Sequence, residues 1–323
     1  MAEQYIYAVA RVRGKELALL NGSFMETLMA AKDYGETLRL LADKGWAAEA
    51  GELPEDILKR EREKTWSFIS ELVEDMSIFD VFLYANDYHN LKAAIKDAVT
   101  SSDHDGAYIS KEQCTFDPAP LKQALRDNQY DVLPEYMREV AKQAMEILLH
   151  TGDGQLTDVI VDAAALHRIY EASKKTGNDI LKLYGELTVA SANIKTAIRA
   201  NRTGKDADFL KRALCPCDSL DVARLAAAAA ESMEEIFAYL ERTEYRAAVE
   251  EIKKSSSAFE RWCDNKVIES MRPQIHNPFT LGPLAAYILA RENEIKTVRI
   301  ILSGKRNSLP EDVIRERVRE MYV

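Results

Sequence analysis

The sequence contains little glycine, proline or cysteine. Its 323 residues include 13 glycines and 9 prolines, whereas a β-sandwich or a doubly wound sheet of this length would need more turn residues. The four cysteines are too few and too scattered for a disulfide framework. Alanine, leucine, glutamate, lysine and arginine dominate instead, and these are strong helix formers. The composition therefore predicts an all-α protein, and the length suits two or three domains.

Basic residues and long apolar runs are also scarce. Lysine and arginine number 43 against 53 acidic residues, a net charge of −10, which argues against nucleic-acid binding because phosphate neutralisation needs a basic surplus. Charged residues interrupt Met1 to Arg13, so no signal core is present there. The apolar stretch Leu281 to Ala290 is about half of a bilayer span. We expect a soluble protein with reduced thiols and no direct membrane insertion.

Motifs that resemble ligand or catalytic sites are all incomplete. Gly204-Lys205 lacks both the upstream glycine and the following Ser/Thr of a phosphate-binding loop. Residues 101–112 are spaced like a calcium loop, but Ser101 stands where the first carboxylate belongs. Cys215-Pro-Cys217 has a single residue between its thiols and no second Cys or His pair nearby to complete a zinc site. The sequence predicts a non-enzymatic protein without cofactor or metal.

Three segments at even spacing resemble one another. They are residues 90–96 (NLKAAIK), 193–199 (NIKTAIR) and 294–300 (EIKTVRI). Their central lysines, Lys92, Lys195 and Lys296, are 103 and 101 residues apart. Apolar residues precede each lysine at helical spacing, with Arg291 interrupting the third stripe, and a polar, glycine-bearing break follows each segment. Either the chain repeats a helical unit three times, or similar amphipathic helices arose by convergence.

The repeat interpretation predicts three related helical bundles of about one hundred residues. We place them at residues 1–116, 117–217 and 218–323, with the first boundary at Asp117-Pro-Ala-Pro and with the termini packed together. Three such units can close around an axis and enclose a hole. Within the third bundle, the alanine-rich run Arg224 to Leu240 is expected to form one closely packed helix.

The ends of the chain carry a family resemblance. Residues 282–317 (GPLAAYILARENEIKTVRIILSGKRNSLPEDVIRER), the ending Met321-Tyr-Val and the opening Tyr5 to Arg13 resemble the C subunit of V-type (vacuolar/archaeal-type) ATPases and ATP synthases, the equivalent of the eukaryotic d subunit. Length and the threefold repeat match that family as well. The resemblance implies three pseudo-threefold related domains that form a funnel with a central pore.

The same resemblance implies a function and partners. The D and F subunits of the central stalk would enter the wide side of the funnel, and the membrane ring of proteolipids would contact the other side. The protein would be a peripheral rotor component on the cytoplasmic side, non-catalytic, passing torque for proton or sodium transport. The alternatives are a cytosolic all-helical scaffold unrelated to ATPases, or an all-helical enzyme, which would need a buried cluster of ionisable groups.

Five cations of the repeated segments are candidate partner contacts. They are Lys92, Lys195, Lys296, Arg199 and Arg299. Charged contacts set register and suit reversible interfaces, so we expect these side chains near the rim or wall of the pore. The competing interpretation is that they are ordinary solvated faces of helices.

Overall fold

The computed structural model describes residues 5–46, 52–100 and 107–323, and its regular secondary structure in these ranges is helical, without a strand. The all-α prediction is confirmed. Two compact units are present, one formed by residues 1–75 together with 247–323 and the other by residues 76–246. The glycine-bearing break and the start of the calcium-like loop, predicted at residues 101–106, lie outside the described residues.

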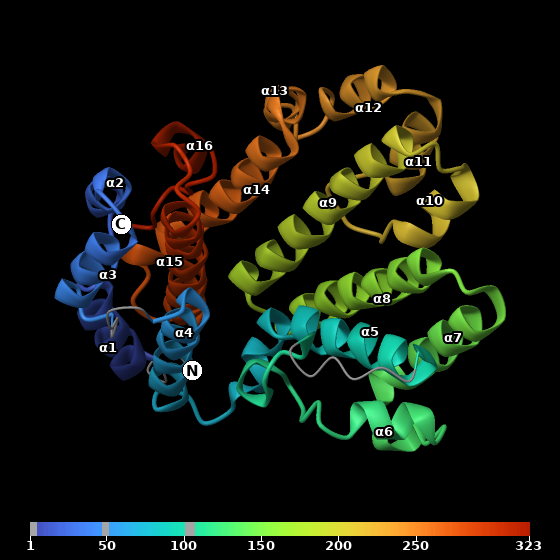
Figure 1. Ribbon diagram of the computed structural model, residues 1–323, viewed down its shortest axis with the longest axis horizontal. Coiled ribbons are helices and arrows are strands. Elements are labelled where there is room, and N and C mark those ends of the chain that lie inside the picture. Colours follow the sequence, from blue (N-terminus) through green and yellow to red (C-terminus); the bar gives the residue numbers. More distant parts are fainter. Residues whose placement is uncertain (1–4, 47–51, 101–106) are drawn as a thin grey trace. The chain divides into compact units, whose positions relative to one another are not determined.

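The first unit contains both ends of the chain and is organised around its longest helix, α15. Helices α1, α3, α4 and α14 pack against α15 (Figure 1). The core beneath them joins residues from positions 20–58 with residues from 295–321. The helices of this unit are α1 (Ile6–Glu16), α2 (Gly22–Ala30), α3 (Tyr34–Asp43), α4 (Pro54–Ser70), α13 (Ala248–Lys254), α14 (Ser256–Met271), α15 (Gly282–Arg306) and α16 (Glu311–Arg315).

The second unit is organised around α8, which packs against α5, α7 and α9. Its main core lies where α5, α6, α7 and α8 meet, and α11 packs on α9 (Figure 1). The α-helices of this unit are α5 (Tyr84–Thr100), α6 (Leu121–Arg126), α7 (Glu135–Thr151), α8 (Gly154–Lys175), α9 (Asp179–Arg202), α10 (Ala207–Ala213), α11 (Val222–Glu231) and α12 (Met233–Leu240). Its 3₁₀ segments are η1 (Met76–Phe82), η3 (Lys111–Gln113) and η4 (Tyr130–Val132).

Side-chain caps determine where the long helices begin. The Asn178 side chain accepts from the N–H groups of Ile180 and Leu181 and so starts α9. Asp153 caps α8 in the same way, immediately after Gly152, which ends α7 in the left-handed conformation at φ 67°. These caps satisfy backbone donors that a helix start leaves unpaired.

The prediction of a single helix from Arg224 to Leu240 is wrong. Ser232 has extended backbone (φ −163°, ψ 167°), which ends α11, and its side chain accepts from the N–H of Glu235 to cap α12. The alanine run favours helix on both sides, but one serine that competes for backbone hydrogen bonds is enough to separate two helices.

Helices α8 and α9 approach closely where Gly185 faces Ser173. A Cβ atom on Gly185 would lie 2.1 Å from Ser173 Oγ and 2.6 Å from Ser173 Cβ. Ser173 is fully buried, and its hydroxyl donates to Tyr170 O. The absence of a side chain at position 185 therefore sets the distance between the two helices of this pair.

We predict that Gly185→Ala destabilises the protein by about 1–3 kcal/mol, because the extra carbon overpacks this contact. Chemical denaturation of the purified chain measures the change. Gly154→Ala on α8 is the matched control, since a Cβ there meets nothing within 4 Å. Adding Ser173→Gly to Gly185→Ala should recover part of the loss. Equal stability of the Gly185→Ala and Gly154→Ala variants would contradict the prediction.

Candidate functional site

The five predicted cations fall on three helices and in two different environments. Lys92 lies on α5, Lys195 and Arg199 on α9, and Lys296 and Arg299 on α15. Lys195 is partly exposed, and both arginines are exposed. These three make no ion pair within the described part of the chain.

The other two cations are held by carboxylates of their own unit. Lys92 Nζ is 2.6 Å from Asp162 Oδ1, and Lys296 Nζ is 2.5 Å from Asp264 Oδ2. Asp264 also accepts from Arg319 Nε at 2.9 Å. Lys92 and Lys296 therefore already contribute to intramolecular ion pairs, whereas Lys195, Arg199 and Arg299 keep their charge available to solvent or to a partner.

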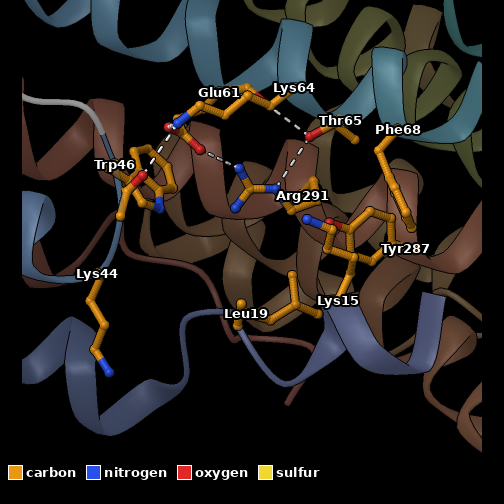
Figure 2. Close-up of a pocket in the computed structure, with 12 residues that line it drawn as sticks. Lys15, Leu19, Lys44, Trp46, Glu61, Lys64, Thr65, Phe68, Tyr287 and Arg291 are labelled. Atoms are coloured by element: carbon orange, nitrogen blue, oxygen red, sulfur yellow. Dashed lines mark hydrogen bonds and ion pairs between the residues drawn. The ribbon is translucent and has the colours of Figure 1, made fainter. Parts of the chain in front are cut away.

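Arg291, which the sequence pattern treats as an interruption of an apolar stripe, is 7% exposed, and all three nitrogens of its guanidinium donate hydrogen bonds. Its Nε donates to Thr65 Oγ1 at 3.2 Å, one terminal nitrogen donates to Glu61 Oε2 at 2.7 Å, and the other donates to Glu294 Oε2. Figure 2 shows the guanidinium reaching from α15 toward the α4 residues Glu61 and Thr65. Buried charge is tolerated only with such pairing.

Glu294 extends this cluster to the beginning of the chain. Its carboxylate is 2% exposed, and its Oε1 accepts from the backbone N–H of Leu20 at 2.5 Å. Burial raises the pKa of Glu294 to about 7, although Arg291 and the Leu20 N–H both favour the ionised form. Burial alone would lower the pKa of Arg291, but the neighbouring Glu294, Tyr287 and Glu61 raise it overall.

A cavity of about 180 Å³ lies beside the Arg291–Glu61 pair in the first unit. Trp46 forms part of its wall, with the Arg291 guanidinium carbon 5.3 Å from the tryptophan ring centroid (Figure 2). Lys64 also lines it and donates to both Glu61 Oε1 and Gly45 O. Because the guanidinium and Glu61 are already engaged with protein partners, the cluster is built as a structural ion-pair network.

The repeated segments of the second unit carry buried asparagines that make the same bonds. Asn90 Oδ1 accepts from Ile109 N at 2.8 Å, and its Nδ2 donates to Ile109 O at 2.9 Å. Asn193 Oδ1 accepts from Cys215 N at 2.9 Å, and its Nδ2 donates to Cys215 O at 2.7 Å. Each asparagine side chain thus donates to and accepts from one backbone residue, and so holds in place the segment that follows its helix.

A second polar network on α5 involves Asp87, Thr115 and Tyr136. The Thr115 hydroxyl donates to Asp87 Oδ2 at 2.7 Å and lies 2.8 Å from Tyr136 OH. The network is shielded from water, and this burial raises the pKa values of Asp87 and Tyr136.

A network of similar composition on α9 involves Glu186, Ser219 and Tyr245, although Glu186 lies one helical turn further from Asn193 than Asp87 lies from Asn90. Ser219 donates twice to Glu186 Oε1, from its backbone N–H at 2.8 Å and from its hydroxyl. The same hydroxyl lies 2.8 Å from Tyr245 OH. Sequence reasoning missed both networks. The only signal for them in the sequence is an acidic residue among the apolar helix positions that precede each lysine, Asp87 before Lys92 and Glu186 before Lys195.

The Cys215-Pro-Cys217 motif lies in the segment that Asn193 of α9 binds. Cys215 Sγ donates to Ala163 O at 3.1 Å, and burial raises the pKa of both thiols to about 11. Both cysteines therefore stay protonated at neutral pH. No group of three His, Cys, Asp or Glu side chains suited to a metal ion occurs in the ranges that the structure describes.

Comparisons with known proteins place the chain among components of rotary ATPases. The model of the ATP synthase (C/AC39) subunit family matches residues 8–317. The C subunit of the V-type sodium ATPase of Enterococcus hirae is 23% identical over 96% of this chain and 97% of its own length. The C subunit of the V-type ATP synthase of Thermus thermophilus is 25% identical over 98% of this chain and 99% of its own.

The chain belongs to the ATP synthase (C/AC39) subunit family. Its members are non-catalytic subunits, and the relatives matched here are the C subunits of V-type ATPases and of V-type and A-type ATP synthases. No helix in the described ranges is long and apolar enough to cross a lipid bilayer. The predicted family resemblance and the prediction that the protein is not an enzyme are confirmed by the family match.

We predict that Arg291→Met destabilises the protein by about 3–5 kcal/mol, because it leaves Glu61 and Glu294 as buried carboxylates without their shared cation. Arg299→Met on the exposed side of the same helix should change stability by no more than about 0.5 kcal/mol. Denaturant unfolding of both variants checks the difference. Two variants of similar stability would show that the cluster does not hold the first unit together.

Proposed function

We propose that the protein is a rotor component that connects the central stalk of a V/A-type ATPase to its membrane proteolipid ring. The observation that carries this proposal is the family match across residues 8–317, together with relatives aligned over nearly their whole length. In this role the chain passes torque between subunits of the D and F type and the ring, for proton or sodium transport. It would work on the cytoplasmic side of the membrane as a peripheral protein.

A torque-transmitting part must be stiff, and the fold of each unit supports that requirement. Long helices meet in close-packed cores, which transmit strain with little compression. In the first unit, α4 and α15 are additionally joined by Arg62, whose Nε lies 2.8 and 3.0 Å from the Glu292 carboxylate oxygens. Lys305 of α15 donates to Met29 O and Ala31 O at the end of α2, both at 2.5 Å.

The funnel of three pseudo-threefold related domains, at residues 1–116, 117–217 and 218–323, is part of the same proposal. The matching bonds of Asn90 and Asn193 support a common origin for the α5 and α9 segments. Glu294 stands at the corresponding place on α15 and also binds a backbone N–H. A closed arrangement of three such units would provide the socket for the stalk.

Among the five candidate cations, Lys195, Arg199 and Arg299 are the best placed to bind a partner. Their side chains make no intramolecular ion pair with the described residues, so binding a carboxylate would not break an existing contact. Lys92 and Lys296 already pair with Asp162 and Asp264. In the proposal these two hold their helices in position and support the interface indirectly.

We predict that the triple variant Lys195→Glu, Arg199→Glu and Arg299→Glu loses at least about tenfold in affinity for the stalk or the ring, since close charge pairs at interfaces contribute about 1.5 kcal/mol or more each. The test is pull-down from membrane extract with the purified chain as bait, followed by identification of stalk and ring proteins. Lys92 and Lys296 are left intact because reversing either would place two carboxylates together.

The matched control reverses three other exposed cations, Lys32, Lys175 and Arg246. It should retain both sets of partners and should unfold at the same denaturant concentration as the triple variant. Unchanged capture by the triple variant would remove these three side chains from the interface. Failure of the unmodified chain to capture either stalk or ring proteins would overturn the proposed function and would favour a cytosolic scaffold.

A further inference from the structure

The walls of the cavity in the first unit carry hydrogen-bond donors that the protein itself does not use. Trp46 and Tyr287 both line the cavity, and they are only 2% and 6% exposed. Neither the Trp46 indole N–H nor the Tyr287 hydroxyl bonds to any residue that the structure describes, yet neither group is sealed from solvent. Because both side chains are otherwise enclosed, these two polar groups face the cavity. Figure 2 shows their rings on opposite sides of Arg291.

Positive charge predominates around the same space. Four cations and one carboxylate line the cavity: Lys15, Lys44, Lys64, Arg291 and Glu61. The buried Glu294, which accepts from Arg291, adds a second carboxylate, so the cations still outnumber the acids four to two. Arg291 and Lys64 both donate to Glu61, whereas Lys15 makes no ion pair within the described ranges. The cavity therefore has a surplus of positive charge.

Lys15 and Tyr287 come together beside Phe68. The Lys15 Nζ lies 5.3 Å from the centroid of the Phe68 ring, and the Tyr287 ring packs edge-on against Phe68 with 5.7 Å between the centroids. Figure 2 shows Lys15 reaching from α1 toward Tyr287. By contrast, Lys44 holds its Nζ over Phe24, 5.1 Å from the centroid of that ring. Lys15 and Tyr287 thus provide an ammonium group and a hydroxyl group at the same end of the cavity.

The side chains of the cavity wall offer few acceptors in return. Both oxygens of Glu61 accept from cations, and Thr65 Oγ1 accepts from Arg291 Nε. Burial raises the pKa of Tyr287 to about 12, so its hydroxyl keeps its proton at neutral pH and can donate. A ligand that satisfies this cavity must therefore supply acceptor oxygens, and the surplus of positive charge favours an anion.

The size of the cavity restricts the ligand further. Its volume of about 180 Å³ is smaller than the roughly 300–1,000 Å³ of sites for drug-sized molecules, so it suits a ligand smaller than a nucleotide. We propose that the cavity binds a small oxyanion, either a phosphate ion or a short-chain carboxylate, that accepts from Lys15 and Tyr287 and has Trp46 as a third donor. Charge-assisted hydrogen bonds of this kind are about twice as strong as those between neutral groups. Oxyanion binding is independent of the proposed rotor role, because it needs neither stalk nor ring.

The test is isothermal titration calorimetry of the full-length chain at neutral pH with sodium phosphate, sodium acetate or sodium chloride at matched ionic strength. We expect saturable binding of one phosphate or one acetate per chain and none of chloride, and the comparison shows which oxyanion is preferred. Lys15→Met and Tyr287→Phe should each weaken this binding at least about tenfold, since each removes a hydrogen bond to a charged oxygen. Tyr287→Phe keeps the ring that packs on Phe68 and removes only the hydroxyl.

The matched control is Lys32→Met, which neutralises an exposed lysine of the same unit outside the cavity and should bind the oxyanion as tightly as the unmodified chain. Lys15 is exposed as well, so neither lysine substitution should prevent folding. The oxyanion should also change the tryptophan fluorescence of the chain, and Trp46→Phe should remove that change. Absence of saturable binding, saturation by chloride with equal affinity, or equal affinity of the Lys15→Met and Lys32→Met variants would overturn the oxyanion site.

Discussion

The first unit depends on a charge that has been taken out of water. Arg291 is buried, and such a charge is stable only if its hydrogen-bond donors find partners. Those partners come from α4 and α15, and Glu294 in turn binds Leu20 near the start of the chain. One guanidinium therefore connects three segments that the sequence places far apart. Apolar side chains from positions 20–58 and 295–321 pack into one core, and the ion pairs add specific contacts between α4 and α15.

In the second unit, asparagines stand at the positions of the repeated segments where the first unit has Glu294. Asn90 and Asn193 fasten their connecting segments by identical pairs of bonds, each beside a chain formed by a carboxylate, a hydroxyl and a tyrosine. Convergent amphipathic helices would share apolar spacing, since any helix that covers a core needs it. They would have no reason to share the pair of bonds that Asn90 and Asn193 each make to a single backbone residue. This agreement supports duplication of a helical unit over convergence.

The sequence predicts the features that depend on local periodicity, and it fails where distant partners decide the outcome. Apolar stripes are enough to predict the long helices, including α9 and α15. The glycine stop predicted at Thr203-Gly204 does end α9, but the stop predicted at Ser303-Gly304 is wrong, because α15 continues through both residues to Arg306. Periodicity predicts an exposed arginine at position 291, because its partner Glu61 lies 230 positions away and cannot be found from local spacing. The pairing of Lys92 with Asp162 is equally non-local. Ser232 is a local signal, but the strong helix preference of the surrounding alanines conceals it.

A carboxyl group with a raised pKa beside a cavity is often a sign of catalysis, so the absence of enzymatic activity in this family needs a physical explanation. Glu61 and Arg291 line the cavity, whereas Glu294 does not. Arg291 lies between Glu294 and the cavity-lining Glu61, and Glu294 directs its oxygens to Leu20 and to Arg291. A general acid must reach the atom that it protonates, and this carboxyl group faces only its own protein. Its altered pKa is therefore a consequence of how the chain's two ends are joined.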